Sequence, residues 1–210
     1  MVAEPPDRRE LILSSAGELF ARKGIGATTV REIADAVGVL SGSLYHHFNS
    51  KDAIVDEVLT GYLEALRTRY AEVLASAAPA RERLYDLVVA SLQIAEQHTN
   101  ATMIYQNESH YLREQPRFDR IKTLAADVQR TWLTVIEAGV ADGSFRDDIE
   151  PRVFYRLIRD AVWLSVRWHR PHGSYSAVQL ADDVTSIFLD GFGSGAKRVV
   201  KSAAGARANG

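Results

Sequence analysis

Apolar residues recur at helical spacing along almost the whole chain, and no stretch shows the period-two alternation of a half-buried β-strand. Glycine or proline interrupts the pattern, as at Gly24, Gly38 and Pro79, and these residues typically mark helix ends. Because helices without a sheet bury their apolar stripes against one another, the spacing predicts an all-α fold. The expected helices cover approximately residues 12–23, 30–37, 41–48, 51–77, 80–97, 101–113, 116–139, 151–170 and 177–191.

Polar residues at the expected helix starts support these boundaries. Thr29 is followed three residues later by Glu32, and Ser176 by Gln179, which is the spacing of a capping box. Ser50 is expected to cap the long helix that follows it.

The helix lengths divide the chain into three parts. Three short helices predict an N-terminal domain over residues 1–50, and six longer helices predict a second domain over residues 51–195. The tail, residues 196–210, is basic and rich in small residues, so we expect it to be disordered.

Composition excludes several classes of protein. The chain of 210 residues has no cysteine, which excludes disulfide frameworks, thiolate zinc sites and thiol nucleophiles. No apolar run approaches the roughly 20 residues of a membrane span, and the charged N-terminus lacks the apolar core of a signal peptide. We therefore expect a soluble cytoplasmic protein without a membrane partner or a cofactor. The net charge of −2 gives no bulk indication of nucleic-acid binding.

Two of the short helices are joined by the turn Val37-Gly38-Val39, and two helices joined by a tight glycine-containing turn form a helix-turn-helix. The helix after the turn begins near Ser41, and Gly42 would let its backbone approach a base edge in the major groove. Its outward side also carries Ser43, Tyr45 and His46. Side chains that donate hydrogen bonds are typical contacts to phosphate oxygens.

The same helix is expected to separate buried from exposed residues. Leu44 and Phe48 lie four residues apart and are expected to point into the core. The residues alone leave open the alternative that Tyr45, His46 and His47 cap a small core. A metal site is disfavoured, because adjacent histidines diverge by about 100° on a helix whereas ligand pairs usually sit four residues apart.

This segment resembles the DNA-binding signature of TetR-type repressors. The pattern T-T-V-R-x-I-A-x-x-x-G-V-x-x-G-S-L-Y-x-H-F-x-S-K runs from Thr28 to Lys51, and the helix lengths after it also fit the family. The resemblance covers essentially the whole chain. It implies a homodimer that binds a palindromic double-stranded DNA operator and a small-molecule effector, and it does not imply an enzyme.

The resemblance also implies individual DNA contacts. Phosphates would be held by Thr29, Tyr45, His47 and Lys51. Nearest the base edges would lie Arg31, Ser41, Gly42, Ser43 and His46. Two positions depart from the family pattern: Leu40 replaces the serine that commonly caps the reading helix, and Ser41 stands where many relatives carry lysine. We therefore expect Ser41 to cap the helix one residue later, which affects the register of base contacts but not the groove.

The N-terminal region carries few positive charges. Residues 1–60 hold six Lys and Arg and nine Asp and Glu, a net charge of −3. Phosphate contacts would then come from few cations, together with hydroxyls, amides and the basic tail. We expect DNA binding that depends only weakly on salt.

The last two helices predict a dimer interface. The apolar stripe of the final helix consists of Leu180, Val184, Ile187, Phe188 and Gly191. Apolar residues of the helix over 151–170 spread over about two-thirds of its circumference at about 100° per residue, which is too wide for one core face. Such a helix is expected to be buried on two sides. TetR-type proteins are expected to pair these two helices with those of a partner in a four-helix bundle.

The remaining arc of the helix over 151–170 predicts an effector site. Arg159, Trp163 and Arg167 stand four residues apart, and an indole rarely faces water. An aromatic plate between two guanidiniums suits a ligand with a flat or apolar body and anionic groups. The alternatives are a solvated charged face or an interfacial ion-pair network with Asp160. Other pocket candidates, each of which fits a core position better, are Met103, Tyr105, Tyr111 and Trp132.

Four stretches narrow the resemblance to one branch of the family. They are VLSGSLYHHF, MIYQNES, QPRF and YRLIRDAVWLSVRWHRP, and they are similar to TetR-type repressors of the late, ring-degrading steps of bacterial cholesterol catabolism. This branch is expected to release DNA on binding an acyl-CoA, the coenzyme A thioester of a steroid ring fragment. Two alternatives stay open: a TetR-type regulator for a fatty acyl-CoA or an aromatic acid, and an all-helical enzyme acting on an acyl thioester. For such an enzyme the chain has neither a G-x-S-x-G elbow nor an H-E-x-x-H motif.

Overall fold

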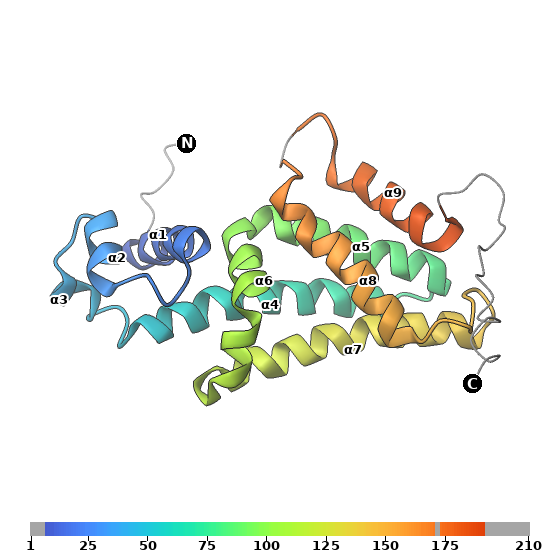
Figure 1. The fold of residues 1–210 in the computed structure, drawn as a ribbon, viewed down its shortest axis with the longest axis horizontal. Coiled ribbons are helices and arrows are strands. Elements are labelled where there is room, and N and C mark those ends of the chain that lie inside the picture. Colours follow the sequence, from blue (N-terminus) through green and yellow to red (C-terminus); the bar gives the residue numbers. More distant parts are fainter. Residues whose placement is uncertain (1–6, 171–172, 192–210) are drawn as a thin grey trace, which may run out of the picture.

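The structure, a computed structural model, describes residues 7–170 and 173–191, and every regular element within them is a helix (Figure 1). The α-helices are α1 (Arg8–Lys23), α2 (Val30–Ala36), α3 (Ser41–Leu44), α4 (Lys51–Ala75), α5 (Ala80–Gln97), α6 (Thr99–Glu114), α7 (Asp119–Ala141), α8 (Pro151–Trp163) and α9 (Ala177–Asp190). Two short 3₁₀ helices are η1 (Pro116–Phe118) and η2 (Leu164–Arg167). The all-α prediction is confirmed.

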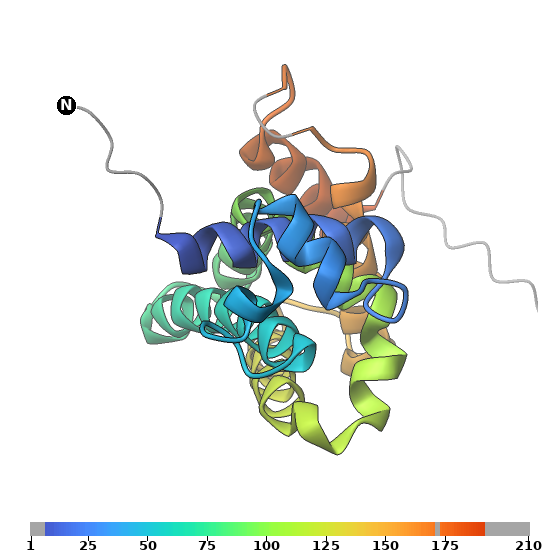
Figure 2. The same cartoon turned by 90° about the vertical axis from the view of Figure 1, so that its left-hand side faces the viewer.

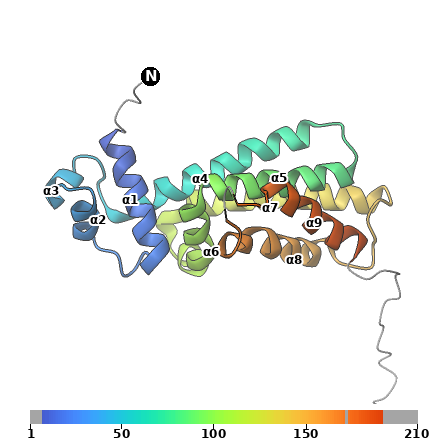
Figure 3. The ribbon, with the colours of Figure 1, turned by 90° about the horizontal axis from the view of Figure 1, so that it is seen from above.

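Helices α1 to α3 form a headpiece at one end of the molecule, with α3 at its outer end (Figures 1 and 3). Figure 2 views the molecule from that end. Helix α4 runs from the headpiece into the body, where it packs against α5 and α7, and α6 packs against α1. Helices α8 and α9 lie on the opposite side of the body from α4 (Figure 3). The headpiece is therefore joined to the body through both α4 and α6.

The predicted caps at Thr29, Ser50 and Ser176 are confirmed by their hydrogen bonds. Thr29 with Glu32, and Ser176 with Gln179, each form a complete capping box. The Ser50 hydroxyl accepts a hydrogen bond from the Ala53 N–H at 3.1 Å. These caps satisfy backbone N–H groups that have no partner inside the helix.

The start of α3 differs from the prediction. Leu40 occupies the N-cap position and its side chain makes no capping hydrogen bond, whereas Ser41 is the first helical residue. The expectation that Ser41 caps this helix is therefore wrong. The α-helix also stops at Leu44, after which the N–H groups of His47 and Phe48 both donate to the Leu44 carbonyl at 3.0 Å.

The end of α8 also differs, because the α-helix stops at Trp163 instead of continuing to residue 170. The Ser165 hydroxyl donates to the Val162 carbonyl, the acceptor that an α-helix would offer to the Val166 N–H. The chain continues as the 3₁₀ helix η2 to Arg167. The start of the helix expected at Pro116 differs too. Pro116 begins the short 3₁₀ helix η1, and α7 begins only at Asp119.

One continuous apolar core runs from the headpiece into the body. It joins Leu44 and Phe48 of the headpiece to Trp132 of α7 and Ile158 of α8. The burial predicted for Leu44 and Phe48 is confirmed, with exposures of 0% and 3%.

Some expectations fall on residues that the structure does not describe. These include the predicted tail at 196–210 and the last residues of the second domain, 192–195. No helix in the described part of the chain is long and apolar enough to cross a membrane. Between residues 7 and 170 and between 173 and 191, no group of three or more His, Cys, Asp or Glu is placed to hold a metal ion.

Candidate nucleic-acid interface and effector site

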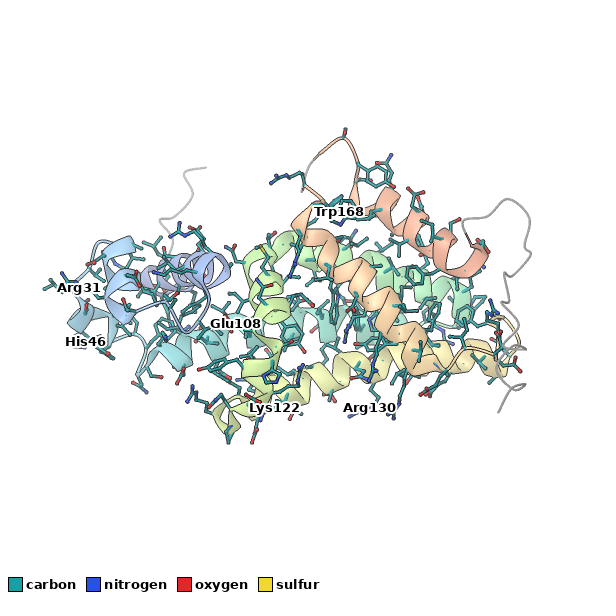
Figure 4. All side chains as sticks on the ribbon, viewed as in Figure 1. Arg31, His46, Glu108, Lys122, Arg130 and Trp168 are labelled. Atoms are coloured by element: carbon teal, nitrogen blue, oxygen red, sulfur yellow. The ribbon has the colours of Figure 1, made fainter. Side chains whose placement is uncertain are left out.

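The exposed side of α3 and the turn after it lies at the outer end of the headpiece, where Figure 4 shows His46. Gly42 and His46 are exposed, and Tyr45 is 52% exposed. Half-buried neighbours are Ser41, Ser43 and His47. Because Tyr45 and His46 face water, the structure favours a reading surface over a core cap at these two positions.

Thr29 has a structural role at the start of α2. Its hydroxyl accepts a hydrogen bond from the Glu32 N–H at 3.2 Å and donates to the Glu32 carboxylate at 3.0 Å. Hydrogen bonds, the one from Lys23 first and those from Thr29 next, lower the pKa of Glu32 to about 2. Glu32 therefore stays ionised at neutral pH, and the hydroxyl proton of Thr29 is already used inside the headpiece.

The turn between α1 and α2 is held from two sides. Lys51 Nζ, at the start of α4, donates to the carbonyls of Ile25 and Thr28 at 2.7 and 2.8 Å. Glu108 Oε1, on α6, accepts a hydrogen bond from the Ile25 N–H at 3.1 Å. Figure 4 shows Glu108 where α6 faces the headpiece. Two of the three N–H bonds of Lys51 are thus used within the protein, which leaves one for a phosphate.

Cations of the headpiece are largely engaged within the protein. Arg9 pairs with Glu57 and lies over the Phe48 ring, 4.6 Å from its centroid. Arg31 is the more available, because its side chain is 85% exposed and its contact to Asp35 is long, at 3.8 Å. Figure 4 shows Arg31 at the outer end of the headpiece. The reading surface therefore offers mainly hydroxyl, imidazole and backbone groups.

A cluster of aromatic side chains fills the body between α4, α6, α7 and α8. The Trp163 indole is 4% exposed and meets the Tyr105 ring edge-to-face, with centroids 6.4 Å apart. Tyr155 packs against Trp132 at 6.1 Å, and Tyr62 packs against Tyr105 at 6.3 Å. Burial raises the pKa of both Tyr155 and Tyr105, so both phenols stay neutral. We call these five residues the aromatic cluster.

Polar atoms within the aromatic cluster are only partly hydrogen-bonded. Trp132 Nε1 donates to the Tyr70 hydroxyl at 3.0 Å, and that hydroxyl also shares a hydrogen bond with Ser91. Burial raises the pKa of Tyr70 to about 12, against the opposing effect of these hydrogen bonds. Trp163 Nε1 lies near the same hydroxyl but has no hydrogen-bond partner among the described residues. A buried donor left unpaired costs about 1–3 kcal/mol, so an acceptor atom of a bound molecule would stabilise this indole.

Of the two predicted arginines, Arg159 contacts the aromatic cluster, whereas Arg167 contacts α6. The guanidinium carbon of Arg159 lies 5.7 Å from the centroid of the Tyr155 ring, and its Nε donates to Asp160 at 2.8 Å. Arg167 is exposed on η2 and donates to the Asn107 side-chain oxygen on α6 at 2.9 Å. The straight row expected of Arg159, Trp163 and Arg167 does not form, because the 3₁₀ segment turns by more per residue than an α-helix. Arg159 also forms an ion pair with the adjacent Asp160 of the same chain, which is a local contact and not the interfacial network considered as an alternative.

The other predicted pocket residues divide into two groups. Tyr105 and Trp132 belong to the aromatic cluster, and Met103 is half-buried on the same helix as Tyr105. Tyr111 lies elsewhere: its hydroxyl accepts a hydrogen bond from Arg117 at 2.6 Å, and its ring packs against η1. Trp132 is 1% exposed and its N–H is satisfied, so the structure gives it a core role.

Sequence reasoning missed Tyr155, Asn107 and Glu108. Tyr155 stands four residues before Arg159, so extending that row by one turn would have found it. No local signal marks Asn107 or Glu108, because their partners lie 60 and 83 residues away in the sequence.

Helix α8 has two apolar sides, as its width predicts. Ile158 and Val162 are fully buried in the body, whereas Val153 and Leu157 are 44% and 58% exposed. Further exposed apolar residues near or on α9 are Trp168, Val178 and Ile187. Figure 4 shows Trp168 beyond the end of α8, on the same side of the body as α9.

The predicted stripe of α9 is split between the body and the surface. Leu180 and Val184 are buried, and Phe188 packs edge-to-face on Phe154 of α8 at 5.8 Å. Ile187 remains 46% exposed. The exposed apolar surface is therefore shared by α8, through Val153 and Leu157, and α9, through Val178 and Ile187.

Comparison with known proteins assigns both parts of the chain. Residues 12–58 match the bacterial regulatory proteins of the tetR family, and residues 77–192 match the tetracycline repressor-like C-terminal domain. The chain belongs to the TetR family. The resemblance seen from Thr28 to Lys51 is thus confirmed, and α3 occupies the position of the reading helix in this family's helix-turn-helix.

Individual relatives of this TetR-family chain include named repressors. It is 46% identical over 187 residues to the transcriptional repressor KstR2 of Rhodococcus jostii (strain RHA1), covering 89% of this chain and 92% of that protein. The structure of the ketosteroid transcriptional regulator KstR2 of Mycobacterium tuberculosis matches with a TM-score of 0.82 at 43% identity, covering 90% of this chain and 96% of that one. The predicted likeness to TetR-type repressors of steroid catabolism is confirmed. The names of these relatives indicate a regulator rather than an enzyme.

The fold also matches AibR, whose structure is in complex with isovaleryl coenzyme A and operator DNA. The TM-score is 0.75 at 19% identity, over 89% of this chain and 100% of that one. At this identity the match concerns the fold alone.

Proposed function

We propose that this TetR-family repressor binds a palindromic operator as a dimer and leaves it on binding the coenzyme A thioester of a steroid ring fragment. The observation that carries the effector half is the aromatic cluster bordered by Arg159, within which the Trp163 N–H is buried without a hydrogen-bond partner among the described residues. Similarity to KstR2 over most of the chain supports the steroid class of effector.

The chemistry of the cluster suits both halves of such a ligand. Tyr155 and Trp163 are buried in the structure, so a fused-ring remnant would have to separate the rings of the cluster; their apolar faces and that of Tyr105 would then contact it. The Arg159 guanidinium can bind a phosphate or carboxylate with two parallel hydrogen bonds. AibR has the same fold and is described with an acyl-CoA and DNA, so the fold can accommodate both ligands.

The DNA half of the proposal rests on α3 and on pairing of two chains. Gly42, Tyr45 and His46 would face the major groove and the neighbouring phosphates. A palindromic operator requires two reading helices separated by about 34 Å, which a dimer provides. The exposed apolar side of α8, with α9, would form a four-helix bundle with a second copy.

Release would follow from a shift in population. The ligand must bind better to the state whose headpieces do not fit the operator. Helix α4 carries the headpiece, so a change in its tilt would move α3. A second connection runs through α6, where Asn107 contacts Arg167 and the adjacent Glu108 contacts the Ile25 N–H.

Footprinting of the purified protein tests the proposal, on an operator selected from a pool of random duplexes. We expect protection of a palindromic site that is lost when the steroid-fragment thioester is added and kept with free coenzyme A. Release by a fatty acyl-CoA or an aromatic acid would instead support a TetR-type regulator for another ligand. Hydrolysis or other turnover of the thioester would indicate an enzyme.

The shortage of free cations predicts a weak salt dependence of operator binding. Arg9, Lys23 and Lys51 are engaged within the protein, which leaves few side chains to displace counterions. In a titration from low to high salt, the log–log slope of the binding constant should be shallower than about −8. A steeper slope would show that more cations reach phosphate than the headpiece offers.

Replacing Leu157 with glutamate should abolish dimerisation. The Leu157 side chain is 58% exposed in the single chain, and a charge buried at an apolar interface is strongly unfavourable. We expect a monomer in sedimentation velocity and a loss of operator affinity of at least about 100-fold, since roughly 3 kcal/mol or more is lost on burying an unpaired charge. Leu74→Glu is the matched control, because Leu74 is 37% exposed at the far end of α4. A dimeric Leu157→Glu variant would rule out this interface.

A further inference from the structure

We propose that Leu40 determines operator specificity by contacting the 5-methyl group of a thymine in the major groove; the inference rests on the proposed binding of operator DNA through α3. Leu40 immediately precedes α3, and its carbonyl accepts the Ser43 N–H at 2.9 Å. Its side chain therefore starts from the N-cap position, immediately before the first turn of the reading helix.

No contact among the described residues explains the exposure of Leu40. The residue is 84% exposed, the highest value among the exposed large apolar residues of the described chain. A Ser, Thr, Asp or Asn at this N-cap position would satisfy a backbone N–H, and Leu40 does not. Leu40 is thus neither buried nor a capping residue, which favours a role in contacting another molecule.

The position of Leu40 points to DNA rather than to a second copy of the chain. Figures 1 and 3 show α3 at the end of the molecule remote from α9. Beside it, Gly42 has no atom within 4 Å of the place a Cβ would occupy, so no residue of the described ranges 7–170 and 173–191 covers this point of the surface. A leucine at the N-cap, next to the small residues Ser41 and Gly42, is therefore free to contact the molecule that the reading helix binds.

The chemistry of the side chain selects the partner. A leucine side chain can neither donate nor accept a hydrogen bond, so it gains no hydrogen bond from phosphates or from the polar edges of bases. In the major groove the thymine 5-methyl group is the apolar feature that distinguishes one base from the others. Each half-site should therefore contain one thymine whose methyl group is read by Leu40.

Deoxyuridine substitution tests this contact, because it removes only the methyl group. In the selected operator, each thymine is replaced in turn and the dissociation constant is measured with the full-length dimer. We expect one thymine per half-site at which the replacement weakens binding about four-fold, the effect of losing one buried methyl group, and about fifteen-fold when both half-sites carry it.

Leu40→Ala should bind the thymine and deoxyuridine operators equally well, whereas Leu11→Ala should keep the wild-type difference. Leu11 is the matched control, since it is a 36% exposed leucine of the headpiece, on α1. Leu40→Ser should also lose the discrimination while unfolding at the same temperature or higher, because serine can cap α3. A thymine preference that survives in Leu40→Ala, or its absence in the wild type, would overturn the assignment of Leu40 while leaving operator binding intact. Failure of the wild type to bind any duplex would overturn the proposed function itself.

Discussion

Replacing Arg159 with alanine should leave operator affinity unchanged and weaken binding of the acyl-CoA effector by about 30-fold or more, as expected for a charge-assisted hydrogen bond worth roughly 2 kcal/mol or more. In the absence of ligand, Arg159 pairs with the adjacent Asp160 and lies over the Tyr155 ring, and ion pairs as exposed as this one contribute little to stability. Isothermal titration with the thioester and a gel shift with the operator measure the two affinities separately.

Arg130→Ala is the matched control for this experiment. Arg130 lies on α7 and pairs with Asp127 at 2.8 Å, much as Arg159 pairs with Asp160, and it is more exposed (Figure 4). The variant loses the same charge and should change neither affinity. Arg159→Lys should recover part of the effector affinity, because lysine keeps the charge without the planar fork.

Tyr45→Ala should give the opposite result and lose the operator while keeping the effector. The Tyr45 side chain is about half exposed and outside the core, so its removal should not unfold the headpiece. If Arg159→Ala instead lost DNA binding or the dimer, the ion pair with Asp160 would be an interface contact and the effector site would lie elsewhere.

The headpiece could be predicted from the sequence because its signals are local. A cap at Thr29, a stop at Gly24 and the spacing of Leu44 and Phe48 each depend on residues within one or two turns. Leu40 is the exception. Its departure from a capping residue was visible in the sequence, but Ser41 did not take over the cap.

The effector site could be predicted only in part, because placing Arg159 and Arg167 on one face assumes that α8 continues as an α-helix to Arg167. The hydroxyl of Ser165 takes the carbonyl of Val162, α8 ends, and Arg167 leaves the row that it shares with Arg159 in the sequence. Burial of Trp163 against Tyr105 likewise joins helices that are 58 residues apart in the chain, and no local pattern reports that contact.

The connection through Glu108 gives the second large effect. Glu108→Ala should bind operator and effector separately but reduce the effect of each ligand on the other by about ten-fold, the equivalent of one hydrogen bond to a charged group at roughly 1.5 kcal/mol. The reason is that Glu108 Oε1 accepts the Ile25 N–H from the turn of the headpiece, while the adjacent Asn107 accepts from Arg167 beside the effector site. Packing at this point is close: Gly24, at φ +85°, would place a Cβ 2.8 Å from the same carboxylate oxygen.

Measuring both legs of the thermodynamic cycle makes this prediction sharp. In any one variant, the factor by which saturating effector lowers operator affinity must equal the factor by which saturating operator lowers effector affinity. Glu108→Gln keeps an acceptor oxygen for the Ile25 N–H and should retain more of the coupling than Glu108→Ala. Glu114→Ala is the control, because that carboxylate lies at the end of α6 and faces His110 at 3.5 Å. Full coupling in Glu108→Ala would assign transmission to α4 alone, since α4 is the other element that joins the effector site to the headpiece.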